Sequence, residues 1–442
     1  MNKVRKRSLS VLLLVAVVIL GMGFYVVRLV IYGGQWASAP FNATIFNDGM
    51  LTVGTVTDRN GVILADIKDG RRIFAETSEI RRATLHAVGD LRGNIGTGAL
   101  TVFAAELTGY NIVTGSYSVT GAGRQIALTI DSNLNAAALR ALDGRRGVVM
   151  VSNYKTGEIL CMVSSPTLDP ANPPDNINSP AYEGVYVNRA IQSAYTPGSV
   201  YKLVTAAAAI ENIWRLNERV FECNGELKTG RGTVTCPGEH GRIDFAQGMS
   251  VSCNVVFGEL ALEMGPDILE SYAERFSLSE RITVSGIQTA QGNFERALPN
   301  SADLAWSGVG QFTNTVCPAT MLRFVGAIAN DGVAVELHYL LRSGASSIIP
   351  NRSTRILNRS TANELADIIK IQNRQSFPNL ELHAKSGTAQ VGIGLEPHAW
   401  YSGYITNEDH PLAFVVIVEN GGGGFAVASP IANRVLQEAI SR

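Results

Sequence analysis

The chain has 442 residues, with 37 Lys and Arg against 38 Asp and Glu, so its formal net charge at pH 7 is −1. At ~150 residues per domain, this length predicts two or three structural units with a sizeable core. Hydrophobic residues make up 46% and charged residues 17%, which excludes a disordered chain. The balanced charge argues against a nucleic-acid partner, because neutralising phosphates requires an excess of Lys and Arg. Five Cys are too few for a disulfide scaffold.

The N-terminus predicts a membrane anchor. Residues 1–7 form a basic tail with four Lys and Arg, and the stretch Ser8–Val27 has no charge. A helix of about 20 apolar residues spans the ~30 Å hydrocarbon core. The basic tail predicts that the N-terminus is cytoplasmic and the rest of the chain extracytoplasmic. We therefore interpret 8–32 as a single-pass signal anchor in the cell membrane.

Two alternatives to the anchor are a signal peptide and a core helix. A cleavable signal peptide has a shorter apolar region, ~7–15 residues, that ends in a small-residue site. Ala37–Ala39 has that form, but Pro40 is a poor neighbour for cleavage. A buried core helix is disfavoured by the length and the flanking charges. The sequence shows no second apolar stretch of this length, so the remainder is expected to be an exported ectodomain.

The ectodomain divides into two expected parts. Residues 42–123 form a short, mixed N-terminal domain, in which Gly54–Ala65 predicts a strand, a tight turn at Asp58–Gly61 and a second strand. Residues 124–442 form the larger part. Its first expected elements are a strand at 125–130, a helix to Leu142 capped by Asp131, and a hairpin of 147–152 with 158–163.

The remaining elements predict an α/β fold with a largely antiparallel sheet. A very apolar helix is expected from Ser199 to about Trp214, with Thr196 as its N-cap and Pro197 early in its first turn. Near the C-terminus we expect three strands and a helix, at 382–391, 398–405, 411–418 and 431–440. Such helix–strands–helix order packs helices on an antiparallel sheet.

The pattern Ser199-Val-Tyr-Lys202 carries the clearest chemistry. Residues three apart share a helix face, so the Lys202 amine can approach the Ser199 hydroxyl. Burial in this apolar helix disfavours the charged amine, and a neutral amine can act as a base on serine. The alternative is a capping Ser and a solvated Lys, because Ser-x-x-Lys arises about once by chance in a chain of this size.

Two further patterns support the catalytic interpretation. Ser252-Cys253-Asn254 precedes a helical stretch; a second hydroxyl can relay a proton, and the Asn254 amide can hold a substrate amide. The alternative is a helix N-cap. In Lys385-Ser386-Gly387-Thr388, a bare Gly on an edge strand lets a peptide approach, and the ammonium and hydroxyls suit a terminal carboxylate. Strand alternation puts Lys385 and Ser386 on opposite faces, so we expect a bulge if both serve the site.

Together, Ser-x-x-Lys, Ser-x-Asn and Lys-Ser-Gly in this order resemble the penicillin-binding proteins, the active-site-serine D,D-peptidase family. Gly54–Ala65 is similar to the signature of its monofunctional class B branch, with Val53 where that signature has Arg, and the short N-terminal region resembles the penicillin-binding protein A type. The resemblance spans roughly residues 50–440. Further similar segments are Leu128–Asp131, Thr156–Leu160, Asn188–Ala190, Pro197–Ser199, Gly308–Gln311 and His398–Trp400.

The resemblance implies an N-terminal domain followed by a β-lactamase-like transpeptidase fold, an antiparallel sheet flanked by helices. It also implies the catalytic roles. Ser199 would attack the carbonyl of D-alanyl-D-alanine in a peptidoglycan stem peptide and release D-Ala. Lys202 would be the base, and Ser252 with Lys385 would shuttle the proton. An amine of a neighbouring stem would then take the acyl group, and β-lactams would acylate the same serine.

The binding roles follow from the same resemblance. Backbone N–H groups of Ser199 and Thr388 would form the oxyanion hole. Asn254 and Gly387 would hold the peptide, and Ser386 with Thr388 its carboxylate. By analogy, we expect the anchor and the N-terminal domain to contact a polytopic membrane glycosyltransferase of the shape, elongation, division and sporulation group.

No metal or cofactor is expected. The six His show no zinc spacing with each other or with Cys, and His398 is interpreted as structural. For Cys223 and Cys236, which bracket a short excursion, a disulfide and two free thiols stay open as alternatives. Cys253 is assigned to packing.

Other functions are compatible with parts of the pattern. A D,D-carboxypeptidase or a serine β-lactamase would transfer the acyl group to water, and the anchor and N-terminal domain disfavour both. A non-catalytic β-lactam-binding scaffold or sensor is the non-enzymatic alternative. A sensor needs a cytoplasmic signalling domain, and only about seven residues precede the anchor.

Overall fold

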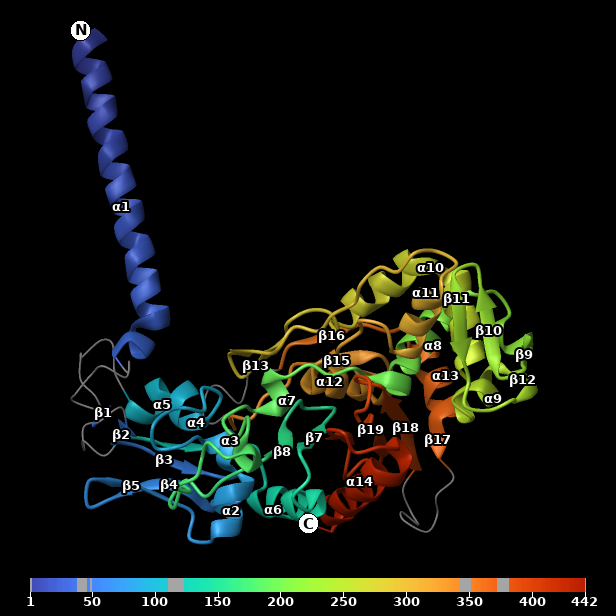
Figure 1. Ribbon diagram of the computed structural model, residues 1–442. Helices are drawn as coiled ribbons and strands as arrows, with labels where there is room; N and C mark the ends of the chain where they lie inside the picture. Colours follow the sequence, from blue (N-terminus) through green and yellow to red (C-terminus); the bar gives the residue numbers. More distant parts are fainter. Residues whose placement is uncertain are drawn as a thin grey trace.

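The structure is a computed structural model that describes residues 2–37, 46–47, 50–109, 123–341, 351–371 and 381–441. It has a long N-terminal helix, a small domain at the foot of that helix and a large C-terminal domain (Figure 1). Within the predicted N-terminal domain, residues 42–45, 48–49 and 110–122 lie outside the described residues.

Helix α1, Asn2–Ala37, contains the predicted anchor. Its apolar part, Arg7–Gly33, is 27 residues long, and all of it except Gly33 at its end is exposed or only partly buried. At 1.5 Å per residue this part is about 40 Å long, enough to cross a bilayer with some tilt. Most of the helix projects away from both domains, and its C-terminal end lies beside α5 of the small domain (Figure 1).

The small domain is built on a four-stranded sheet, in the order β5 (Arg71–Phe74), β4 (Ile63–Lys68), β3 (Thr55–Thr57), β6 (Gln125–Ala127). The predicted strand–turn–strand is confirmed, because β3 and β4 pair antiparallel across the turn. The predicted strand at 125–130 is shorter, and β6 pairs parallel with β3. The other elements here are β1 (Phe46–Asn47), β2 (Met50–Leu51), α2 (Ser78–Ala83), α3 (Leu85–Val88), α4 (Ala99–Val102) and α5 (Ala104–Thr108).

The turn between β3 and β4 joins the two domains. The fully buried Asp58 carboxylate accepts hydrogen bonds from the backbone N–H and hydroxyl of Ser132, at 3.1 and 2.7 Å. Asn60 Nδ2 donates to Asp131 Oδ2 at 3.0 Å, and Arg59 Nη1 to the Thr129 carbonyl at 3.2 Å. These bonds tie the turn to the start of the first large-domain helix, whose predicted cap, Asp131, is confirmed.

A six-stranded antiparallel sheet forms the centre of the large domain. Its order is β17 (Lys370–Ile371), β18 (Glu381–Ala389), β19 (His398–Thr406), β20 (Leu412–Val418), β7 (Gly147–Asn153) and β8 (Ile159–Ser165). The predicted hairpin β7–β8 and the three C-terminal strands are thereby confirmed.

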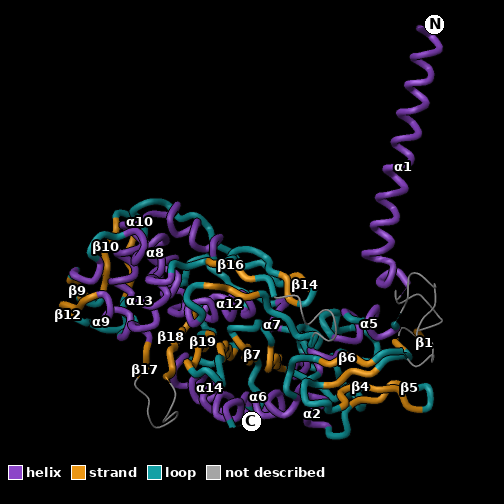
Figure 2. Tube along the Cα trace, turned by 180° about the vertical axis from the view of Figure 1, so that it is seen from behind, coloured by secondary structure: helices purple, strands orange, loops and turns teal. Residues whose placement is uncertain are grey.

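Both faces of this sheet are covered. In β20, Phe414 and Val416 point into the core formed with α6 (Ser132–Leu142) and α14 (Gly424–Ile440), while Val415 and Ile417 point into the larger core that includes α12 (Pro318–Ala329). This explains why β20 is apolar at every position. Figure 2 shows α6 and α14 along one side of the strands.

A mainly helical lobe packs beside the sheet, and it carries small hairpins at its far end (Figure 1). Its helices are α8 (Lys202–Asn212), α9 (Phe245–Ser250), α10 (Asn254–Arg275), α11 (Ala302–Val309) and α13 (Arg359–Ile369). The hairpin strands are β9 (Val220–Cys223), β10 (Glu226–Thr229), β11 (Gly232–Thr235) and β12 (Gly241–Asp244). The remaining elements are α7 (Arg189–Gln192), β13 (Thr283–Val284), β14 (Ile287–Gln288), β15 (Val333–Val335), β16 (Ser353–Arg355), and the 3-10 turns η1 (Pro180–Tyr182) and η3 (Leu216–Glu218).

The helix predicted from Ser199 begins differently. Residues Gly198–Tyr201 form a 3-10 turn, η2, and the α-helix α8 starts at Lys202 and ends at Asn212. Thr196 is not the N-cap; its carbonyl instead accepts a hydrogen bond from Trp400 Nε1 at 2.9 Å. The tight turn results from the close approach of η2 to β18.

Two glycines permit that approach. Gly198 has a φ of +56°, and a Cβ there would lie 2.8 Å from the Thr388 carbonyl oxygen. A Cβ on Gly387 would lie 2.7 Å from the Pro197 carbonyl oxygen. Only residues without a side chain fit on both sides of this contact.

Substitution of Gly198 tests this packing. Gly144→Ala is the control, because Gly144 has a φ of +74° and no atom lies within 4 Å of the position that a Cβ would take. The control should lose about 1 kcal/mol of unfolding free energy from the left-handed backbone alone. Gly198→Ala should lose about 2 kcal/mol more from overlap with β18. Thermal or denaturant unfolding of the detergent-solubilised chain measures both; equal losses would contradict the packing argument.

Candidate active site

A cleft of about 660 Å³ lies between the sheet edge and the helical lobe. It is lined from three directions: by Ser199 on η2, by Ser252 before α10 and Asn254 at the start of α10, and by Ser386 and Thr388 on β18. The structure therefore brings the three sequence patterns together, although 186 positions separate Ser199 from Lys385 in the chain.

Lys202 lies beneath this cleft with a fully buried side chain. Its Nζ is 2.6 Å from the Ser252 carbonyl oxygen, 2.8 Å from Asn254 Oδ1 and 3.2 Å from Ser252 Oγ. The Phe257 ring lies on another side, with its centroid 5.5 Å from the amine. Among the described residues, the amine therefore makes its hydrogen bonds with the Ser-x-Asn segment.

Ser252 connects two lysines. Lys385 Nζ donates to Ser252 Oγ at 2.9 Å, so one hydroxyl lies between the two amines. The segment is held in this position by hydrogen bonds from Ser252 N to the Met249 carbonyl at 3.1 Å and from Cys253 N to the Gly248 carbonyl at 2.8 Å. Ser252 has a φ of +56°, which is rare for serine and indicates local backbone strain.

Both amines have lowered pKa values. Burial, and secondarily the charge of Lys385, lowers the pKa of Lys202 well below its ordinary value of 10.5. Burial lowers the pKa of Lys385 to about 8. Two cations sharing one hydroxyl repel each other, so the site favours one neutral amine near neutral pH.

Ser199 and Lys202 stand on one side of the 3-10 turn, where residues three apart eclipse each other. Among the described residues, the hydrogen bonds of Lys202 go to Ser252 and Asn254, and none goes to Ser199. The Ser199 hydroxyl is therefore left available on the cleft wall. Bonds between catalytic groups often form only when substrate is present.

The expected bulge in β18 is absent. The strand pairs with β19 in unbroken register from Glu381 to Ala389, so Lys385 and Ser386 do lie on opposite faces. Lys385 still reaches the site because its long side chain extends to Ser252 and its amine also donates to the Ser386 carbonyl at 3.0 Å. Ser386 and Thr388 line the cleft along the same strand.

Sequence reasoning missed several residues around the cleft. Gly424 N donates to Thr388 Oγ1 at 3.0 Å, and a Cβ on Gly424 would lie 2.0 Å from the Gly387 carbonyl oxygen. Gly424 thus supports β18, and α14 begins at this residue rather than at Ile431, where the helix was expected. Trp306 and Phe312 also line the cleft, and no motif in the sequence identifies them.

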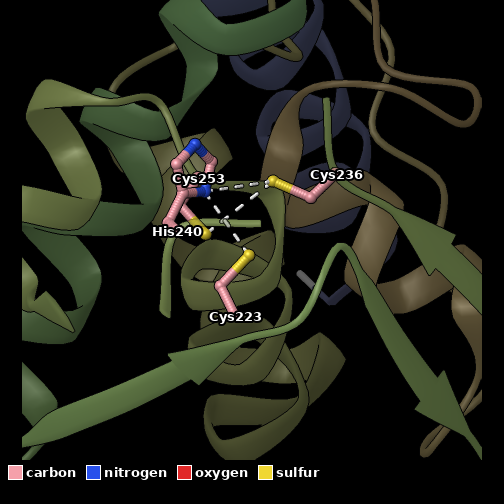
Figure 3. Close-up of side chains that lie close together, drawn as sticks. All are labelled: Cys223, Cys236, His240 and Cys253. Carbon is pink, nitrogen blue, oxygen red and sulfur yellow. Dashed lines mark hydrogen bonds between the residues drawn. The ribbon is translucent and has the colours of Figure 1, made fainter. Parts of the chain in front are cut away.

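Of the two alternatives left open for Cys223 and Cys236, the structure has the two free thiols, and the other three cysteines are free as well. Cys253 does more than fill space: with Cys223, Cys236 and His240 it forms a cluster whose four ligand atoms all lie within 4.8 Å of one another (Figure 3). The expectation that no His and Cys come together in a metal-binding pattern was wrong, because two hairpins fold residues 223–253 back on themselves.

Known proteins show the same domain. Residues 147–437 match the family model described as the penicillin binding protein transpeptidase domain. The peptidoglycan D,D-transpeptidase PbpA of Mycolicibacterium smegmatis is 28% identical over 361 residues, which cover 72% of this chain and 73% of that protein.

Solved structures agree with the fold. The D,D-transpeptidase domain of a peptidoglycan glycosyltransferase from Eggerthella lenta matches with a TM-score of 0.74 and 26% identity, covering 88% of this chain and 98% of that one. The ceftriaxone acyl-enzyme of penicillin-binding protein A from M. tuberculosis matches with a TM-score of 0.73 over 88% and 98% of the two chains; at 23% identity this likeness shows the fold. Because the family model covers more than half of its length, this chain belongs to the penicillin-binding protein transpeptidase family.

Proposed function

We propose that this protein is a serine-type peptidoglycan D,D-transpeptidase that cross-links stem peptides through an acyl-enzyme formed at D-Ala-D-Ala, and that β-lactams acylate the same serine. The observation that carries the proposal is the Ser252 hydroxyl between two buried lysine amines, in the cleft that Ser199 lines. The similarity to PbpA of M. smegmatis supports the same reaction.

The geometry supports a path for the proton. Neutral Lys202 takes the Ser199 proton as the hydroxyl oxygen attacks the penultimate D-Ala carbonyl carbon. Ser252 bridges Lys202 and Lys385, so it can pass a proton to the nitrogen of the departing D-Ala. An amine of a second stem peptide then attacks the ester, its proton returns through the same groups, and Ser199 is regenerated.

The cleft walls suggest how the donor peptide is held. We assign Asn254, Ser386, Gly387 and Thr388 to the peptide and its terminal carboxylate, because they border the cleft or, for Gly387, lie between two residues that do. Asn254 is itself oriented, since its Nδ2 donates to the Thr235 carbonyl at 2.9 Å. We assign the oxyanion hole to the backbone N–H groups of Ser199 and Thr388.

Acylation by benzylpenicillin tests the nucleophile. Wild-type full-length protein in detergent should gain the mass of one intact penicillin, and Ser199→Ala should gain none, because the acyl ester needs the Ser199 oxygen. Intact-mass spectrometry measures both.

The other outcomes distinguish the alternatives. Consumption of penicillin without a lasting adduct would indicate a β-lactamase. An inert wild-type protein would favour a non-catalytic scaffold. Release of D-Ala from a stem peptide with water rather than an amine as acceptor would indicate a D,D-carboxypeptidase.

The lysine pKa values predict a bell-shaped pH dependence of acylation. The rate should fall tenfold per pH unit on the acid side, as Lys202 gains a proton, with a midpoint well below 10.5. It should fall again above about pH 8, as Lys385 loses the proton passed to the leaving group.

Stopped-flow acylation across the pH range measures this profile. In Lys385→Arg the guanidinium stays charged, so the alkaline fall should move to higher pH while the acid side is retained. A wild-type rate that climbs steadily to pH 10.5 would contradict the assignment of Lys202 as the base.

We propose that α1 is a single-pass anchor with a cytoplasmic N-terminus and that the catalytic domain is extracytoplasmic. The exposed apolar surface of Arg7–Gly33 and the basic residues before it support this topology. The proposed division of the chain is a tail (1–7), an anchor (8–32), an N-terminal domain (42–123) and a transpeptidase domain (124–442).

We further propose that α1 and the N-terminal domain contact a polytopic membrane glycosyltransferase, since a cross-linking site acts on strands that another active site polymerises. That partner should co-purify with the full-length protein and be lost when residues 1–123 are replaced by an unrelated anchor and spacer. Penicillin acylation of the full-length protein and of the variant with residues 1–123 replaced serves as the folding control. Unchanged recovery of the partner would contradict this interface.

A further inference from the structure

The structure assigns a zinc site to four side chains beside the active-site cleft: Cys223, Cys236, His240 and Cys253. We propose that the bound ion holds the Ser252–Asn254 segment in its catalytic position. The presence of the site does not depend on the proposed function, whereas its effect on acylation does.

The spacing of the donor atoms fits a tetrahedral ion. Zinc bonds of ~2.3 Å to sulfur and ~2.0 Å to nitrogen separate two sulfurs by ~3.8 Å, and sulfur from nitrogen by ~3.5 Å. His240 Nδ1 lies 3.4 Å from Cys223 Sγ and 3.6 Å from Cys236 Sγ, and Cys236 Sγ lies 3.9 Å from Cys253 Sγ. Figure 3 shows the three sulfurs and the imidazole nitrogen directed at one another.

The donor types favour zinc. Three sulfurs and one imidazole are soft ligands, which excludes a magnesium or calcium site, and four protein ligands close a tetrahedral zinc site without an open position. A disulfide would require sulfurs ~2.05 Å apart and would leave one thiol and the imidazole unused.

Backbone groups around the cluster also suit metal-bound thiolates. Asn254 N donates to Cys236 Sγ at 3.3 Å. Such N–H donors stabilise negative sulfur and fix the orientation of the metal's ligands.

The ligands come from a part of the chain that has little core of its own. Cys223 ends β9, Cys236 and His240 lie in the connection from β11 to β12, and Cys253 precedes α10. Nine of the 16 residues in strands β9–β12 are exposed, and only Phe221, Cys223 and Val234 are buried. Small hairpins with so little buried apolar surface commonly depend on a metal for stability.

The cluster lies directly against the catalytic groups. Cys253 stands between Ser252 and Asn254, so a metal bond to its sulfur restrains both neighbours. Asn254 also donates two hydrogen bonds to the segment that carries the other ligands. Its backbone N–H donates to Cys236 Sγ, and its Nδ2 donates to the Thr235 carbonyl. The ion would therefore join the two chain segments that orient the Asn254 amide and the Ser252 hydroxyl.

Metal analysis of the full-length, detergent-solubilised protein, purified without chelator, tests the site. Wild type should contain about one zinc per chain, and Cys223→Ser should lose most of it, because a neutral hydroxyl is a poor ligand. Cys317→Ser is the matched control, since Cys317 is equally buried and lies outside the cluster, with its Sγ donating to the carbonyls of Ala190 and Ile191; this variant should keep its zinc.

Cobalt substitution covers the case in which Cys223→Ser does not fold. Wild type stripped with a chelator and loaded with Co²⁺ should show the strong absorption of tetrahedral cobalt with thiolate charge transfer. Absence of zinc and of this spectrum would overturn the site in favour of empty thiols. Two cysteines that resist alkylation in the denatured, chelator-treated protein until reductant is added would overturn it in favour of a disulfide.

Acylation kinetics test the positioning role. The acylation rate of the chelator-stripped wild type with penicillin should be at least about tenfold lower, and added zinc should restore it. We expect this loss because the ion orients Ser252 and Asn254 through Cys253. Full acylation without metal would overturn the positioning role. A zinc-loaded wild type that never acylates would instead contradict the proposed function and leave the metal result standing.

Discussion

The burial of the Lys202 amine is the constraint on which the site depends. An amine removed from water must find polar partners, and here they are supplied by one short segment, Ser252–Asn254. That requirement fixes α8 against the connection between α9 and α10, and the strained backbone of Ser252 is part of the arrangement. The same burial lowers the pKa of Lys202, so the packing that stabilises the lobe also prepares a base.

The helical lobe contacts the edge of the sheet through the backbones of η2 and β18, with almost no side chains between them. The cleft lies beside this contact. Gly198 and Gly387 let η2 lie directly on β18, and Gly424 supports the same strand from the far side. Trp400 adds a hydrogen bond to Thr196 across this contact. The serine on η2 is thereby held against β18, in the cleft that Ser386 and Thr388 of this strand also line.

The hairpins β9–β12 form a small, exposed region beside the cleft. Cys223, Cys236 and His240 converge on Cys253, which lies in the segment that contacts Lys202, so the ion that we propose there would link the hairpins to the Ser252 hydroxyl. At the other end of the large domain, the Asp58–Asn60 turn ties the membrane-proximal domain to the start of α6. Polar hydrogen bonds thus join the small domain to the large domain, at a place separate from the hairpins beside the active site.

The sequence alone determined the apolar N-terminal helix, the β3–β4 and β7–β8 hairpins, the C-terminal strands and the short patterns that meet at the cleft, because these depend on local periodicity and spacing. It could not determine the 3-10 turn at Ser199, the unbroken register of β18 or the role of Gly424, since each is set by contact with a distant strand or helix. The cysteines show this most clearly. Spacing along the chain indicated no zinc site and left a disulfide open, and only the folding of two hairpins onto α10 brought three sulfurs and one imidazole within reach of one ion.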